Sequence, residues 1–362
     1  MSAEKPGRPV DPPPVTGGES LRALIETRFP AFAGRNVREV HRIMRRSLED
    51  DCAVFATLSG AMTPAGLHTS VVIPLVRSGA ISCLTTTGAN LYHDVHRLLG
   101  HTIHELSPLA DDLALREARI IRIYDLGFDE DVLLDTDRFF LEVMKRPEFQ
   151  RPMTTPEFHH ALGRAVAAVE DERGAPNSTV LGACFRADVP IFSGAVQDGS
   201  IFLNAVRLQR EDPRFLFRID AGRDVYQMAA LQNLARQGGG KAAIWILGGG
   251  VPKNYTLQGE PLLSQILGVD ARGFDYDAQV CVDVVDNGAL SPCTAGEGHT
   301  WGKTSAECVE TSSAYLRTDV TIAAPFLAEA LLSDPALQRP PRRLFARIAE
   351  AERALDALWM TG

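Results

Sequence analysis

Lys303 has a setting suited to catalysis, because it follows Trp301 and Gly302 and lies six residues after an isolated acid, Glu297. An amine attacks carbon only when it is neutral, and burial against aromatic surface lowers the pKa of a lysine by penalising its ammonium form. Glu297 could then move the proton. The spacing therefore predicts covalent chemistry at Lys303, with Glu297 as its acid–base partner.

Two plainer interpretations compete with this one. Gly302-Lys303-Thr304 is similar to the end of a phosphate-binding loop, but that motif needs a glycine five positions before its second glycine, where this chain has Glu297. A surface lysine in a turn is the ordinary explanation of any single lysine. The mismatch disfavours a nucleoside-triphosphate loop, and other features of the chain favour the catalytic interpretation.

Three successive glycines, Gly248, Gly249 and Gly250, follow a strand-like run that ends at Leu247. Because glycine lacks Cβ, the main chain there can come close to a flat ring or a pyrophosphate. The dinucleotide fingerprint is incomplete, since Lys253 stands where its third glycine belongs. A tight turn explains these glycines equally well.

Two more turns carry groups that a nucleotide could use. Thr86, Thr87 and Gly88 offer hydroxyl and N–H groups after one apolar run, and Asp198 follows another. Such groups can bind ribose or phosphate, although a solvated turn is an equal alternative for each. Three turns of this kind favour a nucleotide site more strongly than any one of them.

The elements that must position these turns alternate along the chain. Helical spacing covers residues 21–46, with a break at 30–34, as well as 156–172, 224–236, 323–332 and 342–358, and Thr155 is expected to cap the second of these helices. Short apolar runs that end in glycine- or threonine-rich turns occupy residues 52–58, 80–84, 118–124, 189–192, 242–247 and 278–285. This alternation predicts an α/β fold, a Rossmann-like, mostly parallel sheet flanked by helices, with ligands beyond the carboxyl ends of the strands.

Composition sets the broad class. We expect a flexible proline- and glycine-rich arm at residues 1–18 and a single α/β domain at 19–362. The net charge of −9 argues against a nucleic-acid partner, and the absence of a secretory leader or of eighteen consecutive apolar residues argues against a membrane protein. The sequence thus predicts a soluble, cytoplasmic protein. Its six cysteines form no C-x-x-C pair, so neither a zinc ribbon nor a disulfide framework is indicated.

A histidine cluster offers a rival site. His93, His96, His101 and His104, with Glu105, could bind zinc in a metal hydrolase. The three-residue spacing within each pair suits zinc less well than the four-residue spacing of H-E-x-x-H, and Gly100 separates the pairs. We therefore expect no metal, with the histidines on a helix surface.

Taken in order, these pieces resemble deoxyhypusine synthase over residues 35–332. The most specific matches are Leu247-Gly248-Gly249-Gly250-Val251-Pro252-Lys253 and Trp301-Gly302-Lys303, and the turns at Thr86 and Asp198 add support. The resemblance implies an NAD-dependent transferase in which NAD takes hydride from spermidine, 1,3-diaminopropane leaves, and the hydride is later returned. It implies that Lys303 carries the butylamine unit as an imine and passes it to an acceptor amine.

The resemblance also assigns roles to single residues. It implies that Trp301 lines the alkyl chain and that Glu297 binds the amine or moves protons. It implies a homotetramer with cofactor sites at the subunit interfaces. It places NAD at Thr86, Thr87, Gly88, Asp198, Gly248, Gly249, Gly250 and Asp319.

Three substrate positions depart from the family pattern. Asn254 stands at a family histidine, and Leu203 and Leu290 stand at family aspartates that bind the polyamine. Each lost charge-assisted hydrogen bond is worth about 1.5 to 3 kcal/mol. We therefore expect a polyamine to be bound differently here, by an enzyme that transfers to a small amine, as the related homospermidine synthases do with putrescine. Modification of a protein lysine and an inactive NAD-binding scaffold remain alternatives.

Overall fold

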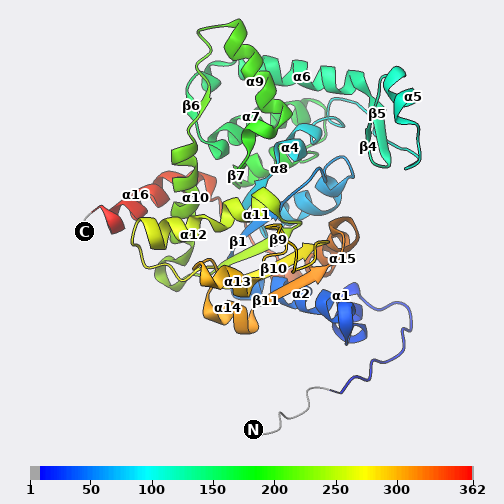
Figure 1. Cartoon of the computed structure of the whole chain (residues 1–362), viewed down its shortest axis with the longest axis vertical. Coiled ribbons are helices and arrows are strands. Elements are labelled where there is room, and N and C mark those ends of the chain that lie inside the picture. The colour runs from blue at the N-terminus through cyan, green and yellow to red at the C-terminus, as the bar shows by residue number, and fades with distance from the viewer. Residues whose placement is uncertain (1–8, 361–362) are drawn as a thin grey trace.

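Six parallel strands form the central sheet of the computed structural model, which describes residues 9–360 (Figure 1). Every neighbouring pair in this sheet is parallel, which confirms the Rossmann-like, mostly parallel sheet expected from the sequence. The strands lie in the order β11 (Ser313–Arg317), β10 (Tyr276–Cys281), β9 (Ala242–Leu247), β1 (Ala53–Leu58), β2 (Cys83–Thr86) and β7 (Ile191–Phe192).

Helices bury both faces of the sheet. Along β9, Trp245 packs into one hydrophobic cluster, whereas Ile244 and Ile246 pack into the other, as the two-residue period of a strand requires. The first cluster includes residues of α2 (Phe32–Glu49), α3 (Ile73–Arg77) and α15 (Val320–Leu332). The second includes residues of α10 (Ala221–Arg236), α11 (Gly250–Leu257) and α16 (Ile348–Trp359). Burial on both faces explains why the strands read as continuous apolar runs.

The remaining helices cover the edges of the sheet and build the part drawn above it in Figure 1. The α-helices are α1 (Leu21–Arg28), α4 (Gly88–His93), α5 (Asp112–Glu117), α6 (Glu130–Met144), α7 (Thr155–Glu172), α8 (Val180–Ala187), α9 (Ser200–Glu211), α12 (Gly259–Pro261), α13 (Ala295–Thr300) and α14 (Ala306–Thr311). Short 3-10 helices span Pro147–Phe149, Val196–Asp198, Gln237–Gly239, Pro335–Leu337 and Phe345–Arg347, and π-helical turns span His68–Val72 and Leu262–Ile266.

One predicted parallel strand is wrong. The run at residues 118–124 forms β4 (Ile120–Ile123), which pairs antiparallel with β5 (Leu126–Asp129) in a small sheet that also contains β3 (His104–Glu105). A tight turn at Tyr124 and Asp125 makes the hairpin, and β4 is only half-buried. A third sheet contains only β6 (Pro152–Met153) and β8 (Arg218–Ile219).

Several boundaries also differ from expectation, and three of them have a clear local reason or cap. Strand β10 ends at Cys281 rather than at residue 285, because Val282 and Val285 are exposed and the chain has left the sheet. Helix α7 is capped by Thr154, whose side chain accepts from the N–H of Glu157, and not by Thr155. The last predicted helix begins at Ile348 rather than at residue 342, after a 3-10 turn.

The described part of the expected arm, residues 9–18, contains no helix or strand, and its side chains are exposed. Residues 1–8 of that prediction lie outside the described residues. No helix among residues 9–360 is long and apolar enough to cross a membrane.

Candidate active site

All the segments expected to bind NAD follow carboxyl ends of the parallel strands. Thr86 ends β2 and continues into Thr87 and Gly88, Gly248 follows β9, and Asp319 follows β11 at the edge of the sheet. Asp198 lies in the turn after β7, at the other edge. The carboxyl ends of parallel strands share one rim of a sheet, which is where such folds bind ligands. The topology therefore collects these segments along one rim, while their role in binding stays a prediction.

Close packing explains two of the three successive glycines. Gly248 has φ +89°, and a Cβ there would lie 1.9 Å from the Ser59 Oγ. A Cβ on Gly249 would lie 2.6 Å from the Ser291 Cβ. Gly250, with φ +59°, has no heavy atom within 4 Å of its Cβ position. Only Gly250 leaves open space that a ligand could enter.

Serine hydroxyls already bind the N–H groups of this turn. Ser59 Oγ accepts from the N–H of Gly249 at 3.2 Å, and Ser291 Oγ accepts from the N–H of Gly250 at 3.1 Å. Both donors at the start of α11 are thus satisfied by the chain itself. An anion bound here would have to displace a hydroxyl from each N–H group.

The threonine turn is tied to its neighbours in the same way. Thr86 donates its hydroxyl hydrogen to the Leu58 carbonyl at 3.0 Å, and Thr87 donates to the Gly60 carbonyl at 2.6 Å. Gly88 packs against Gly199, since a Cβ on Gly88 would lie 2.5 Å from the Gly199 Cα. This contact brings the segment that contains Asp198 beside the threonine turn.

Two predicted cofactor residues have carboxylates in different situations. Asp319 caps α15 and accepts from the N–H and hydroxyl groups of Thr321 at 2.8 Å and 2.5 Å. Asp198 is exposed, and its carboxylate has no hydrogen-bond partner among the described residues. The Asp198 carboxylate is therefore the freer acceptor of the two, while that of Asp319 is engaged in capping α15; the role of either in binding NAD stays a prediction.

Lys303 is buried beside α11. Its side chain is 9% exposed, and its Nζ donates to the Asn254 Oδ1 at 3.2 Å. Asn254 follows Gly250 by four residues on α11, so this hydrogen bond links the amine to the helix that begins at the glycine turn. The predicted nucleophile is thus tied to the helix that follows one of the predicted cofactor segments.

Burial lowers the pKa of Lys303 from its ordinary value, while the acidic groups of Cys293 and Glu297 act in the opposite direction. The Trp301 ring centre lies 5.9 Å from the Lys303 Nζ, but the indole itself is 56% exposed. The expected burial of the lysine is present, although the tryptophan covers only part of it. A neutral amine is favoured more here than on an exposed lysine.

The backbone of the segment that contains Lys303 is held at the amino end of β10. Lys303 accepts at its carbonyl from the N–H of Phe274 at 3.0 Å, and Thr304 forms a bridge with Phe274. Glu297 lies on α13, one helical turn before this segment, and is exposed. Leu290, 41% exposed, lies in the loop between β10 and α13.

A second buried lysine supports that loop, and the sequence interpretation missed its role. Lys253 is 1% exposed, and its Nζ donates to the Gln279 Oε1 at 2.8 Å and to the carbonyls of Ser291 and Cys293 at 3.0 and 2.6 Å. Burial lowers its pKa. Its place in the glycine-rich motif was the available signal, but a lysine three residues after a turn does not reveal that it will have three buried acceptors.

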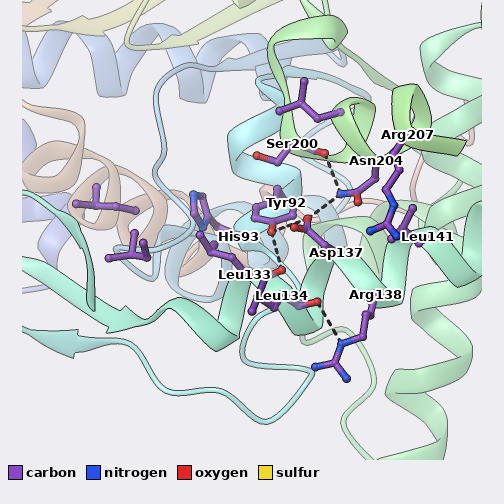
Figure 2. A pocket seen from close by; sticks show the side chains of 13 residues that line it. Tyr92, His93, Leu133, Leu134, Asp137, Arg138, Leu141, Ser200, Asn204 and Arg207 are labelled. Atoms are coloured by element: carbon purple, nitrogen blue, oxygen red, sulfur yellow. Dashed lines mark hydrogen bonds between the residues drawn. The ribbon is translucent and has the colours of Figure 1, made fainter. Parts of the chain in front are cut away.

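Leu203 lies away from Lys303 within one chain. It sits on α9 and lines a cavity of about 750 Å³ between α6 and α9, shown in Figure 2. Figure 1 shows α9 and α13 well separated, with strands of the central sheet between them. The structure thus joins Lys303, Asn254 and Trp301 but leaves Leu203 in another cavity.

The histidines do not assemble a metal site. His93 and His96 hydrogen-bond to each other at 2.8 Å, and His96 also bonds to Thr136. His101 lies 3.3 Å from Asp135, while His104 is exposed on β3. Within residues 9–360, no group of three or more His, Cys, Asp or Glu side chains is arranged to bind a metal ion.

Comparison with known proteins gives a consistent set of relatives. A family model described as "Deoxyhypusine synthase" matches residues 24–331. A "Deoxyhypusine synthase-like protein" from Thermosynechococcus vestitus is 39% identical over 356 residues, which cover 97% of this chain and 88% of the relative. A "Probable deoxyhypusine synthase 2" from Methanosarcina mazei is 32% identical over 327 residues, covering 90% and 89%.

A solved structure from Entamoeba histolytica, described as a "putative deoxyhypusine synthase", has the same fold. It superposes with a TM-score of 0.54 at 12% identity and covers 89% of this chain and 96% of that one. At this identity the likeness supports the fold alone.

Proposed function

Because this chain belongs to the deoxyhypusine synthase family, whose members are aminobutyltransferases that generally use NAD, we propose that it transfers an alkylamine group from a polyamine to an acceptor amine through an imine on Lys303. The single observation that carries the proposal is the Lys303 amine, which is buried, has a lowered pKa and lies against Asn254. A protein gains no stability by burying an unpaired lysine charge, so a catalytic use is favoured.

The residues at the rim of the sheet fit NAD. Gly250 leaves open space, and the Asp198 carboxylate is a free acceptor beside the threonine turn. When bound, NAD would take a hydride from the amine donor and return it after the transfer. Asp198 would accept from ribose hydroxyls, and Gly250 would let the main chain approach the cofactor.

Four residues of the chain itself would carry out the remaining steps of the transfer, and a fifth would hold one of them in place. Neutral Lys303 forms the bond to the carbon that loses its original amine, and Asn254 orients the lysine by accepting from its Nζ. Glu297 receives or supplies protons from α13, and Trp301 covers the alkyl chain. Lys253 fixes the loop that leads to Glu297 and so maintains its position relative to Lys303.

We infer a small amine as the acceptor, because Leu203 and Leu290 offer no carboxylate at the positions where the family pattern has aspartates. A homotetramer would allow Leu203 of one copy to approach Lys303 of another, which a single chain does not achieve. Light scattering of the purified protein tests this assembly. A monomer with full transfer activity would contradict it.

The lysine is tested by Lys303→Ala, with Lys145→Ala as the matched control, since Lys145 is exposed just after the end of α6. We expect Lys303→Ala to abolish transfer and to leave NAD binding intact, because the lysine carries the transferred group rather than the cofactor. The assay incubates the protein with NAD and a panel of polyamines and amines, and mass spectrometry detects the products. Transfer retained by Lys303→Ala would remove the lysine from the mechanism.

Borohydride trapping tests the covalent step directly. Reduction in the presence of NAD and the active amine should leave a mass adduct on the peptide that contains Lys303. An adduct on Lys253 or Lys145 instead would reassign the nucleophile. If no amine in the panel reacts but a protein lysine is modified, the acceptor part of the proposal is wrong while the lysine chemistry stands.

A further inference from the structure

The cavity between α6 and α9 combines apolar walls with one carboxylate (Figure 2). Its volume is about 750 Å³, and among the described residues that line it Asp137 is the only acidic one. Its apolar lining includes Ile121, Ile123, Leu133, Leu134, Leu141 and Leu203. The apolar part suits an alkyl chain, and because Arg138 and Arg207 also line the cavity, the charge offered to a ligand depends on how these side chains are paired.

Asp137 has one oxygen in use and one free. Its Oδ1 accepts from the Tyr92 hydroxyl at 2.9 Å and from the Asn204 Nδ2 at 2.7 Å. Among the described residues, its Oδ2 has no hydrogen-bond partner. The two donors fix the direction of the carboxylate, which leaves a pre-oriented acceptor at the cavity wall.

Two arginines at the cavity do not neutralise this carboxylate by contact. Arg138 pairs with Asp135 on its own helix, and Arg207 pairs with Glu211 at 2.7 Å. Neither guanidinium forms an ion pair with Asp137 in the described structure, and both side chains are mostly exposed. Arg207 lies close enough to attract Asp137 electrostatically, but the carboxylate keeps an oxygen that no guanidinium contacts.

A hydrogen-bond relay adds a second acceptor. The hydroxyl hydrogen of Thr136 goes to the Val132 carbonyl at 2.7 Å, so the Thr136 oxygen must accept from the His96 Nδ1 at 2.8 Å. Burial lowers the pKa of His96 to about 3, so its Nε2 is unprotonated and accepts from the His93 Nδ1 at 2.8 Å. Burial likewise lowers the pKa of His93 to about 4, which leaves the His93 Nε2 as a lone-pair acceptor.

From this arrangement we propose that the cavity binds an aliphatic amine, with Asp137 accepting from an ammonium group and His93 Nε2 accepting from a further N–H. The apolar side chains cover the methylene chain, and Leu203 contributes to this wall. The inference rests on the proposed function in that the amine is a substrate of the transfer. It assigns amine recognition to Asp137 and His93, in a chain that lacks the aspartate at position 203.

Calorimetry on the full chain tests the site with 1,4-diaminobutane as the probe, and with 1,4-butanediol and butanoate as uncharged and anionic controls. Asp137→Asn keeps an acceptor for Tyr92 and removes the charge, so we expect the dissociation constant for the diamine to rise about tenfold or more. Asp131→Asn is the matched control, since Asp131 lies on the same helix and is exposed. The Asp131→Asn variant should bind the diamine with the dissociation constant of the wild type.

A second variant keeps the test independent of the buried network. Leu203 is 60% exposed at the cavity, so Leu203→Asp should fold and should tighten diamine binding by adding a second carboxylate. His93→Phe keeps the ring volume and should weaken binding less than Asp137→Asn does. Butanediol or butanoate binding as tightly as the diamine, or diamine binding unaffected by Asp137→Asn, would overturn the proposal.

The two proposals fail separately. Lys303→Ala should abolish transfer, whereas Asp137→Asn should weaken diamine binding, so the two variants report on the two proposals separately. If the wild type transfers no group but binds the diamine through Asp137, only the proposed function fails. If transfer occurs and Asp137→Asn alters neither the dissociation constant nor the KM for the amine, only this inference fails.

Discussion

Gly248 and Gly250 lie two residues apart in one turn, yet the structure predicts opposite consequences for the same substitution. Gly248→Ala would place a methyl group 1.9 Å from the Ser59 Oγ, at φ +89°. Gly250→Ala would place its methyl group in open space, at φ +59°. The first change should therefore reduce stability, and the second should mainly affect whatever occupies that space.

The magnitudes follow from these geometries. A left-handed backbone costs an alanine about 1 to 2 kcal/mol at either position. At Gly248, Ser59 must also rotate away and give up its bonds to the Gly249 N–H and the Leu247 carbonyl, at about 1 kcal/mol each. We expect Gly248→Ala to lower the free energy of unfolding by about 3 to 4 kcal/mol and Gly250→Ala by about 1 to 2 kcal/mol.

Urea denaturation followed by tryptophan fluorescence, at one protein concentration for all variants, measures both values. Ser59→Ala in the Gly248→Ala background removes the clashing oxygen, so the two losses should be less than additive. Calorimetric titration with NAD supplies the second readout, in which Gly250→Ala should weaken binding. Equal stability losses for the two glycine variants, or additive losses with Ser59→Ala, would refute the reasoning.

Three further outcomes follow from the lysines and their partners. A pH profile of kcat/KM should rise with pH as Lys303 becomes neutral. The midpoint of this rise should lie below the ordinary lysine pKa of about 10.4, because burial lowers the pKa of Lys303. Asn254→Asp should move the midpoint of the kcat/KM profile to higher pH by about one unit or more, since a carboxylate beside the Lys303 Nζ stabilises its ammonium form. A shift of the midpoint to lower pH would contradict this geometry. Lys253→Met should lower the free energy of unfolding by about 3 kcal/mol or more, because it strands three acceptors, whereas Lys145→Met should change it by less than about 0.5 kcal/mol in the same urea assay.

Much of the fold was predictable because buried parallel strands carry a strong local signal. Runs such as residues 242–247 are apolar throughout and end at glycine turns, and the structure confirms them as strands buried on both faces. The hairpin at β4 was not predictable in the same way. Its isoleucines suit a buried strand, and only the pairing with β5, across a two-residue turn without glycine, makes the run antiparallel and half-buried.

The candidate site was predictable in its residue types and less so in its contacts. Burial of Lys303 was expected, but the bond to Asn254 depends on how α11 packs beside the loop after α13. The separation of Leu203 from Lys303 follows from tertiary packing, which a linear motif does not encode. Lys253 and Asp137 were missed because their partners come from distant segments.

The contact between Gly88 and Gly199 has a consequence for reading mutational scans. Edge strand β7 is joined to β2 by two residue pairs, and the glycine contact adds a further point at which the segment after β7 is held against the end of β2. A side chain at Gly88 or Gly199 would push the turn after β7 away from β2 and would move the Asp198 carboxylate with it. If substitutions at Gly88 and Gly199 are not tolerated, the close approach of the two backbones is a sufficient reason. Intolerance alone would not indicate that a ligand contacts these residues.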